Sequence, residues 1–190
     1  MKATVINLDS RADRMETFKK NNFPFDVERF SGIVLPSGED GFTKSVLIVI
    51  GSQKEYPFII FEDDCIMLES WDVVENAISQ LPDDWDALWL GATLTRKLER
   101  YSENLYKLKR AYTTHAVIYN SPEMVDFILK NHNTPPGRNL DIFYFSVVQN
   151  TFNCFITYPL CATQSEGYSD ISKQNTGSWI IKSSYNKYTQ

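Results

Sequence analysis

The chain has 190 residues, of which 43% are hydrophobic and 14% aromatic, enough apolar material for one compact domain over residues 1–190. Its formal net charge of −5 argues against the uniformly basic surface of general nucleic-acid or anionic-membrane binders. The three cysteines form no C-x-x-C pair, and no apolar run approaches the roughly 18 residues that span a bilayer. We therefore expect a soluble, cytoplasmic protein, free or peripheral to a membrane.

Apolar runs and helical patterns alternate along the chain. Strands are predicted, in order, at 3–8, 58–61, 86–91, 114–120 and, less regularly, 152–160. Helices that follow a serine cap are predicted at 10–21, 70–81 and 121–131. Residues 140–150 fit a helix or a strand, and residues 42–54 fit a helix unless the run 46–50 forms a strand. This alternation indicates an α/β domain with a largely parallel sheet flanked by helices.

Three carboxylates, Glu62, Asp63 and Asp64, follow the apolar run 58–61 directly. Buried carboxylates need a compensating cation or an edge that is open to water. Ligands of open α/β sheets bind beyond the carboxyl ends of the strands, where this triplet falls. If the strand continues, Glu62 and Asp64 project to one side and Asp63 to the other. The pattern fits a divalent cation that bridges a diphosphate, or else a solvated turn that caps the next helix.

Polar residues also follow the first predicted strand. Asn7 and Asp9 end this strand, and Arg11 and Arg14 lie three residues apart on the helix that follows. Such a junction offers amide and guanidinium donors to an anionic or nucleotide ligand. The alternative is an ordinary surface helix whose charges pair along its first turns.

Two single residues are candidates for catalysis. His115 lies within the apolar run 114–120, so it is either a buried core histidine or a catalytic or metal-binding residue. Asp141 stands at the start of the apolar segment 140–150, where an N-cap and a general base are the two interpretations.

Residues 96–110 carry six basic and two acidic side chains, although the whole chain is acidic. Such a segment could steer a polyanionic acceptor, including modified DNA, or form a solvated hairpin or helix face. Tyr101, Tyr106 and Tyr112 are interleaved with the charges and could stack on sugar rings or bases, or only pack.

Six blocks in order resemble glycosyltransferase family 25, which groups bacterial lipooligosaccharide galactosyltransferases with collagen-hydroxylysine enzymes. The blocks are VINLDSRADRM, FIIFEDDCIM, DALWLG, TTHAVIYN, the pair LD at 140–141, and QSEGYSDI at 164–171. The resemblance covers residues 3–172 and leaves 173–190 as a tail to which we assign no function. One departure is Val46, which stands where the family's G-C-x-x-S-H block has histidine, although Gly41 and Ser45 fit that block.

The resemblance implies a GT-A-like fold and an inverting transfer of a sugar from a nucleotide-sugar donor to a saccharide acceptor. The family default for the donor is UDP-galactose, with Mn²⁺ or Mg²⁺ held at a D-x-D-like motif by Asp64 and Glu62. Glu62 or Asp63 would contact the ribose or the metal's waters, and Asp9 and Arg11 the nucleotide. Asp141 would be the catalytic base. The resemblance of the TTHAVIYN block also slightly favours a catalytic or metal-binding role for His115.

The last block implies a late loop that folds over donor or metal, with Gln164, Ser169 and Asp170 as contacts. Two other functions remain open: a glycosyltransferase that acts on hydroxymethylated or otherwise modified DNA, and a nucleotide-sugar or glycan binding module that has lost turnover. The stretch 96–110 motivates the first, and Val46 motivates the second.

Overall fold

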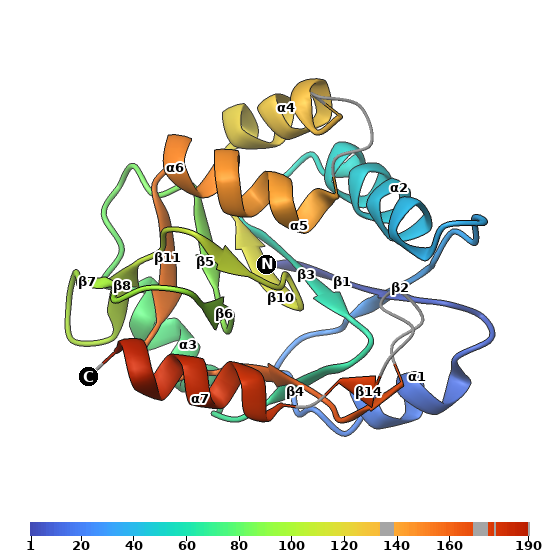
Figure 1. Cartoon of the computed structure of the whole chain (residues 1–190), viewed down its shortest axis with the longest axis horizontal. Coiled ribbons are helices and arrows are strands. Elements are labelled where there is room, and N and C mark those ends of the chain that lie inside the picture. Colours follow the sequence, from blue (N-terminus) through green and yellow to red (C-terminus); the bar gives the residue numbers. More distant parts are fainter. Residues whose placement is uncertain (134–138, 169–174, 177, 190) are drawn as a thin grey trace.

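A computed structural model describes residues 1–133, 139–168, 175–176 and 178–189. Its centre is an eight-stranded mixed sheet between helices (Figure 1). The strand order is β2 (Glu28–Ser31), β1 (Lys2–Asn7), β3 (Phe58–Glu62), β10 (Ala116–Tyr119), β5 (Ala87–Trp89), β11 (Cys154–Thr157), β8 (Leu105–Lys107) and β7 (Glu99–Arg100). Only β10 and β8 run against the other six strands, so the sheet is mostly parallel in direction, as predicted.

Three short ribbons complete the β structure. They pair β4 (Cys65–Met67) with β12 (Ala162–Gln164), β6 (Thr93–Leu94) with β9 (Ala111–Tyr112), and β13 (Gly167–Tyr168) with β14 (Asn175–Thr176). The helices are α1 (Ala12–Phe18), α2 (Gly38–Ser52), α3 (Trp71–Ile78), α4 (Pro122–Asn131), α5 (Leu140–Phe143), a π-helix (Tyr144–Val148), α6 (Gln149–Thr151) and α7 (Trp179–Tyr188). In the described residues, no helix has the length and apolarity needed to cross a membrane.

Alternation along the central strands builds two cores, one on each face of the sheet. Phe58 and Ile60 of β3 point into a core with α2, α4, α5 and the π-helix, whereas Ile59 and Phe61 point into a core with α1 and α3. Figure 1 shows the same two layers, with α2, α4, α5 and α6 on one side of the sheet and α1 and α3 on the other. Both faces are covered, which explains why β3 is a continuous apolar run.

The structure confirms the α/β architecture and decides the open segments. The four strands predicted at 3–8, 58–61, 86–91 and 114–120 become β1, β3, β5 and β10 of the central sheet. Residues 42–54 lie mainly in α2, and residues 140–150 form the α5, π-helix and α6 series, so neither is a strand. The cap predicted at Ser10 is wrong, because α1 has Arg11 as its N-cap residue.

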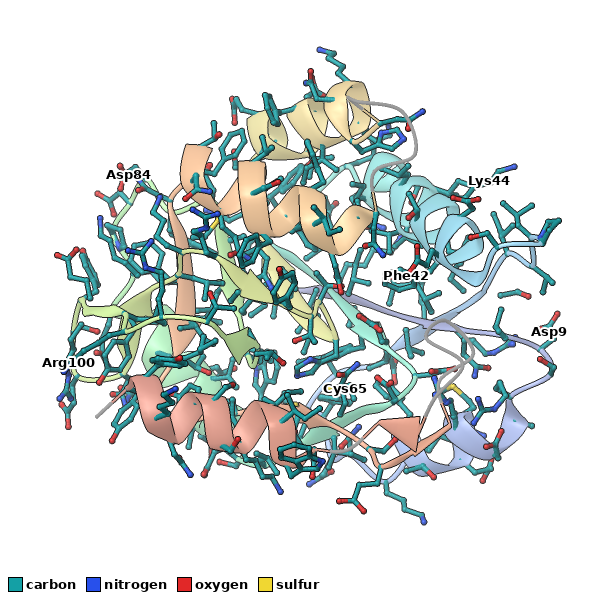
Figure 2. The ribbon with its side chains drawn as sticks, viewed as in Figure 1. Asp9, Phe42, Lys44, Cys65, Asp84 and Arg100 are labelled. Carbon is teal, nitrogen blue, oxygen red and sulfur yellow. The ribbon has the colours of Figure 1, made fainter. Side chains whose placement is uncertain are left out.

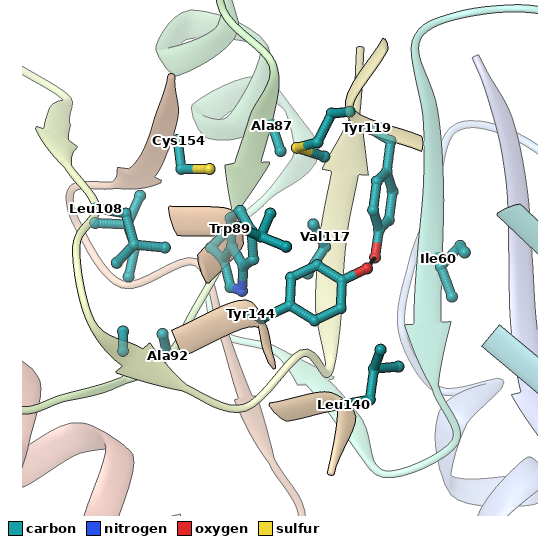
Figure 3. Close-up of a cluster of buried hydrophobic side chains, with 14 of the residues drawn as sticks. Ile60, Ala87, Trp89, Ala92, Leu108, Val117, Tyr119, Leu140, Tyr144 and Cys154 are labelled. Atoms are coloured by element: carbon teal, nitrogen blue, oxygen red, sulfur yellow. Dashed lines mark hydrogen bonds between the residues drawn. The ribbon is translucent and has the colours of Figure 1, made fainter. Parts of the chain in front are cut away.

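A buried pair of tyrosines ties β10 to the π-helix. The hydroxyl oxygens of Tyr119 and Tyr144 lie 2.8 Å apart, and the two residues are 2% and 1% exposed (Figure 3). The ring of Trp89 meets Tyr144 edge-on at 5.9 Å between centroids. Each hydroxyl is the other's partner inside an apolar core, so the two side chains depend on each other.

We expect Tyr119→Phe to lower the free energy of unfolding by about 1 to 2 kcal/mol, because it leaves the Tyr144 hydroxyl buried without this partner. The double variant Tyr119→Phe, Tyr144→Phe should lose less than the sum of the single variants, since it removes both hydroxyls. Urea unfolding of the four proteins measures this coupling. Additive losses would contradict the pairing.

Candidate functional site

A cavity of about 530 Å³ lies at the carboxyl ends of β1 and β3. This is the edge of an open α/β sheet where ligands usually bind, and the volume suits a small-molecule ligand. Its wall comes from the β1–α1 junction, the β2–α2 loop, the start of α2, the acidic triplet and the segments at 113 and 139–141. The wall includes Arg14, Glu39, Ser45, Glu62, Asp63, Asp64, Thr113, Asn139, Asp141 and Gln164.

All three carboxylates of the triplet line this cavity. The strand does not continue through the triplet, so the alternation that depended on it does not apply: β3 ends at Glu62, and Asp63–Asp64 form a turn. Strand geometry therefore no longer sets the direction of the last two side chains. The turn brings Asp63 and Asp64 to the same cation, Arg14.

Asp63 is the carboxylate with the most complete set of partners. Arg14 Nη1 donates to Asp63 Oδ1 at 2.9 Å, and Asn7 Nδ2 donates to Asp63 Oδ2 at 2.8 Å. Asn7 also donates to the carbonyl of Arg11 at 3.0 Å and accepts from Arg29 Nε at 2.8 Å. Asn7 is 2% exposed and is absent from the cavity wall, so it orients Asp63 rather than facing a ligand.

Asp64 has weaker partners. Arg14 Nη1 lies 3.8 Å from Asp64 Oδ2, and Gln164 Nε2 is 3.4 Å from both carboxylate oxygens. Burial raises the pKa of Asp64 to about 6, against the attraction of Arg14. Asp64 therefore has unused acceptor capacity at the cavity surface.

The Thr114 hydroxyl lies between two further carboxylates of the cavity wall, Glu62 and Asp141. Thr114 Oγ1 donates to Glu62 Oε1 at 3.0 Å and lies 3.4 Å from Asp141 Oδ1. Burial and the charges of Asp64 and Asp141 raise the pKa of Glu62 well above its usual value. Burial also raises the pKa of Asp141 to about 6, while hydrogen bonds from Thr114 and the Thr113 backbone act in the opposite direction. Asn139 caps α5 by accepting from the Asp141 N–H at 2.8 Å, so Asn139, not Asp141, is the N-cap residue.

The charge of the cavity wall is strongly unbalanced. Among the described residues, Arg14 is its one basic side chain, against five acidic ones: Glu39, Glu62, Asp63, Asp64 and Asp141. The raised pKa values of Glu62, Asp64 and Asp141 show that this arrangement disfavours their ionised forms in the absence of further cations.

The oxygen donors fit a hard divalent cation, although not a closed protein cage. Within the described ranges, no group of three His, Cys, Asp or Glu side chains has metal-holding geometry. Mg²⁺ commonly takes one or two carboxylates and completes its octahedron with waters and substrate phosphates. Asp64 and Glu62 are the candidates for such a pair: both line the cavity, and the charge of Asp64 contributes to the raised pKa of Glu62.

The structure leaves several predicted site residues outside the cavity wall. Asp9 lies at the outer end of the β1–α1 loop, where it pairs with Arg29 and is exposed (Figure 2). Arg11 donates two hydrogen bonds to the Asp13 carboxylate, from Nη2 at 2.9 Å and from Nε at 3.0 Å. Neither residue lines the cavity, whereas Arg14 and Gln164 do. Ser169 and Asp170 lie outside the described residues.

His115, the residue that precedes β10 in the chain, is fully buried and does not line the cavity. A Cβ placed on Gly91 would come 2.9 Å from His115 Nε2 and 2.0 Å from the Ala162 carbonyl oxygen, so the imidazole packs against backbone. Burial lowers the pKa of His115 to about 4, which keeps the ring neutral. His115 therefore lies outside the cavity wall to which Asp141, the other predicted catalytic residue, belongs.

The middle of the basic stretch 96–110, residues 99–107, forms the hairpin of β7 and β8. These strands end the sheet at the edge opposite β2, so the hairpin is far from the cavity, and Arg100 and Asp9 lie at opposite ends of the molecule (Figure 2). Its cations have local partners: Arg100 lies over the Tyr158 ring and Lys107 over the Tyr101 ring. The hairpin interpretation is confirmed.

Sequence patterns missed the bridging role of Thr114 and the roles of Gly41 and Ser45. Ser45 Oγ accepts from the Ile33 N–H at 2.9 Å and donates to the Gly41 carbonyl at 2.8 Å. A Cβ on Gly41 would lie 2.4 Å from the Ile33 carbonyl oxygen. These two residues therefore hold the β2–α2 loop against α2, and Val46 is a buried core residue beside them.

Comparisons with known proteins show the fold alone. A scan of family models finds no match, including none to glycosyltransferase family 25, and a search of curated proteins also finds none. Among solved structures, A197 from STIV matches with a TM-score of 0.58 and 10% identity over 92% of this chain and 93% of that chain. Mannose-1-phosphate geranyltransferase from Thermus thermophilus matches with a TM-score of 0.41 and 7% identity, over 81% of this chain and 58% of that chain. The chain shares its overall fold with A197.

Proposed function

We propose that this protein is a glycosyltransferase that moves a sugar from a nucleotide-sugar donor to a hydroxyl of a saccharide acceptor. One observation carries the proposal: the acidic cavity lies at the carboxyl ends of β1 and β3, where an α/β sheet binds nucleotides. A diphosphate could enter so acidic a site only together with divalent cations, and such a cation would relieve the repulsion between Glu62 and Asp64.

In this proposal Asp64 and Glu62 would hold Mn²⁺ or Mg²⁺, and the ion would supply positive charge against the departing diphosphate. Arg14 remains beside Asp63 and adds a guanidinium near the phosphates. Gln164, 3.4 Å from Asp64, keeps that carboxylate directed at the cavity. UDP-galactose is the family default for the donor and rests on the resemblance alone.

Asp141 is the proposed general base. In an inverting transfer its carboxylate takes the proton of the acceptor hydroxyl while that oxygen forms a bond to the anomeric carbon. The bond between the anomeric carbon and the diphosphate oxygen breaks at the same time, and the nucleoside diphosphate leaves with the electron pair. A pKa near 6 suits this role, because the group is ionised at neutral pH yet remains basic.

We expect UDP-sugars to raise the unfolding temperature in the presence of Mn²⁺ but not in the presence of EDTA. At a ligand concentration of about 100 times Kd, binding to the native state adds about 2.7 kcal/mol, or roughly 5 to 10 °C for a chain of this size. A thermal-shift screen of UDP, GDP and CMP sugars with and without Mn²⁺ measures this. Absence of any metal-dependent shift would contradict the proposal, and binding without hydrolysis or transfer would identify a binding module instead.

A further inference from the structure

A stacked aromatic pair, of which Tyr112 is exposed and Phe145 is half-buried, lies one residue along the chain from the cavity wall. Tyr112 of β9 and Phe145 of the π-helix stack with 4.3 Å between ring centroids and 7° between ring planes. The Arg110 guanidinium lies against Phe145 at 5.1 Å from its centroid. Tyr112 is 38% exposed, so this stack leaves a substantial part of the tyrosine available to a ligand.

The segment that carries Tyr112 is held firmly on both sides. Buried Gln149 accepts from the Ala111 N–H at 2.7 Å and donates to the Ala111 carbonyl at 2.9 Å. Trp89 Nε1 donates to the Thr113 carbonyl at 3.2 Å. Arg110 and Thr113 have φ of 57° and 74°, a region that costs free energy for side-chain-bearing residues, above all a β-branched one. Such strain persists only where the surroundings impose it, and it is typical of ligand sites.

Position links this platform to the proposed base. Thr113, the next residue after Tyr112, lines the cavity, and its backbone makes a hydrogen bond to the Asp141 carboxylate. Thr113 Oγ1 is buried and has no hydrogen-bond partner among the described residues. The exposed Tyr112 ring offers an apolar surface, and the Thr113 hydroxyl and the Asp141 carboxylate offer polar groups near it. This combination suits a cyclic ligand that is apolar on one face and polar at its edge.

We propose that Tyr112 is the acceptor platform: the pyranose ring of the acceptor stacks on the Tyr112 ring, with a hydroxyl directed to Thr113 and Asp141. This inference rests on the proposed function, since it names where the acceptor of that reaction binds. The C–H face of a pyranose is apolar enough to pack on an aromatic face, and its equatorial hydroxyls then point outward from the stack toward polar neighbours.

The test is saturation-transfer difference NMR with three probes: methyl β-D-galactopyranoside, methyl β-D-glucopyranoside and lactose. Wild type should bind at least one of them, with the strongest signals on the ring C–H protons of one face. Tyr112→Ala should weaken that binding at least fivefold, while Tyr112→Phe should retain it because the ring remains. Tyr101→Ala is the matched control, since Tyr101 is 40% exposed but lies on the distant hairpin.

Each remaining outcome overturns the platform. These outcomes are no binding of any probe, equal binding by wild type and Tyr112→Ala, or equal losses in Tyr112→Ala and Tyr101→Ala. A loss of UDP affinity in Tyr112→Ala without a loss for the glycosides would assign the ring to the donor base instead. Failure of the proposed function is distinguishable, because it appears as absent Mn²⁺-dependent UDP-sugar binding while the glycosides still bind Tyr112.

Discussion

Asp64→Asn should lower Mn²⁺-dependent turnover of a UDP-sugar by at least about 100-fold while the fold remains intact. The substitution removes the charge of a carboxylate that faces the cavity and, among the described residues, has only long side-chain contacts, at 3.4 and 3.8 Å. A metal that no longer binds there cannot neutralise the leaving diphosphate, a contribution worth several kcal/mol, and every 1.4 kcal/mol is about tenfold in rate.

The measurement is the release of nucleoside diphosphate at saturating Mn²⁺, with circular dichroism to confirm the fold. Asp26→Asn is the control, because Asp26 is exposed and does not line the cavity. Turnover of Asp64→Asn within tenfold of wild type would remove Asp64 from the metal site. Loss of turnover together with an unchanged Mn²⁺-dependent thermal shift would also contradict its role as a ligand.

Asp141→Asn should abolish transfer and at the same time stabilise the ligand-free protein at neutral pH. The pKa of Asp141 is about 6 in the folded protein and 3.8 in its usual state, so the folded chain holds this proton more tightly. As pH rises from about 4 to 6, the unfolded state has already lost the proton and the folded state loses it only at a cost, so stability falls. At pH 7.5 the full deficit of about 3 kcal/mol applies, whereas at pH 4.0 only about 0.5 kcal/mol does.

Burial is the main cause of the raised pKa of Asp141, and the charge of Glu39 adds to it. Hydrogen bonds from Thr114 and the Thr113 backbone act in the opposite direction. Asparagine cannot ionise, so Asp141→Asn escapes the deficit. His115, whose pKa is lowered to about 4, destabilises the fold at acid pH in both proteins and therefore cancels in the difference. Urea unfolding in EDTA at pH 4.0 and 7.5 measures the difference, and a gain that does not grow with pH contradicts it.

Sequence reasoning was most successful where both faces of an element are buried. β1, β3, β5 and β10 are near-continuous apolar runs because helices cover both sides of the sheet, and each was predicted. β2, with sequence ERFS, is mostly exposed at the sheet edge and has no apolar pattern to find. The antiparallel direction of β10 depends on tertiary pairing with β3 and β5, which no local pattern encodes.

The same limit applies to the candidate site. The triplet and Asp141 stand out in the sequence because charges interrupt apolar runs, and both line the cavity. Thr114 does not stand out, because a threonine beside a strand is ordinary and its bridge joins residues 52 and 27 positions away. The position of Asp9 and Arg11 after β1 predicts contact with a nucleotide. In the structure, however, Asp9 pairs with Arg29 and Arg11 pairs with Asp13 outside the cavity wall. Side-chain partners, rather than chain position, decide which residues face a ligand.

In the proposed function, Asp64 and Glu62 are the protein ligands of a metal ion that also binds the diphosphate of the donor. A crystal structure with Mn²⁺ and UDP, using anomalous scattering to locate manganese, tests this central claim most directly. We expect an anomalous peak within coordination distance of the Asp64 carboxylate, bridged to the phosphates of UDP inside the cavity bounded by Arg14 and Asp141. UDP bound elsewhere, or bound in the cavity without manganese at Asp64, would contradict it.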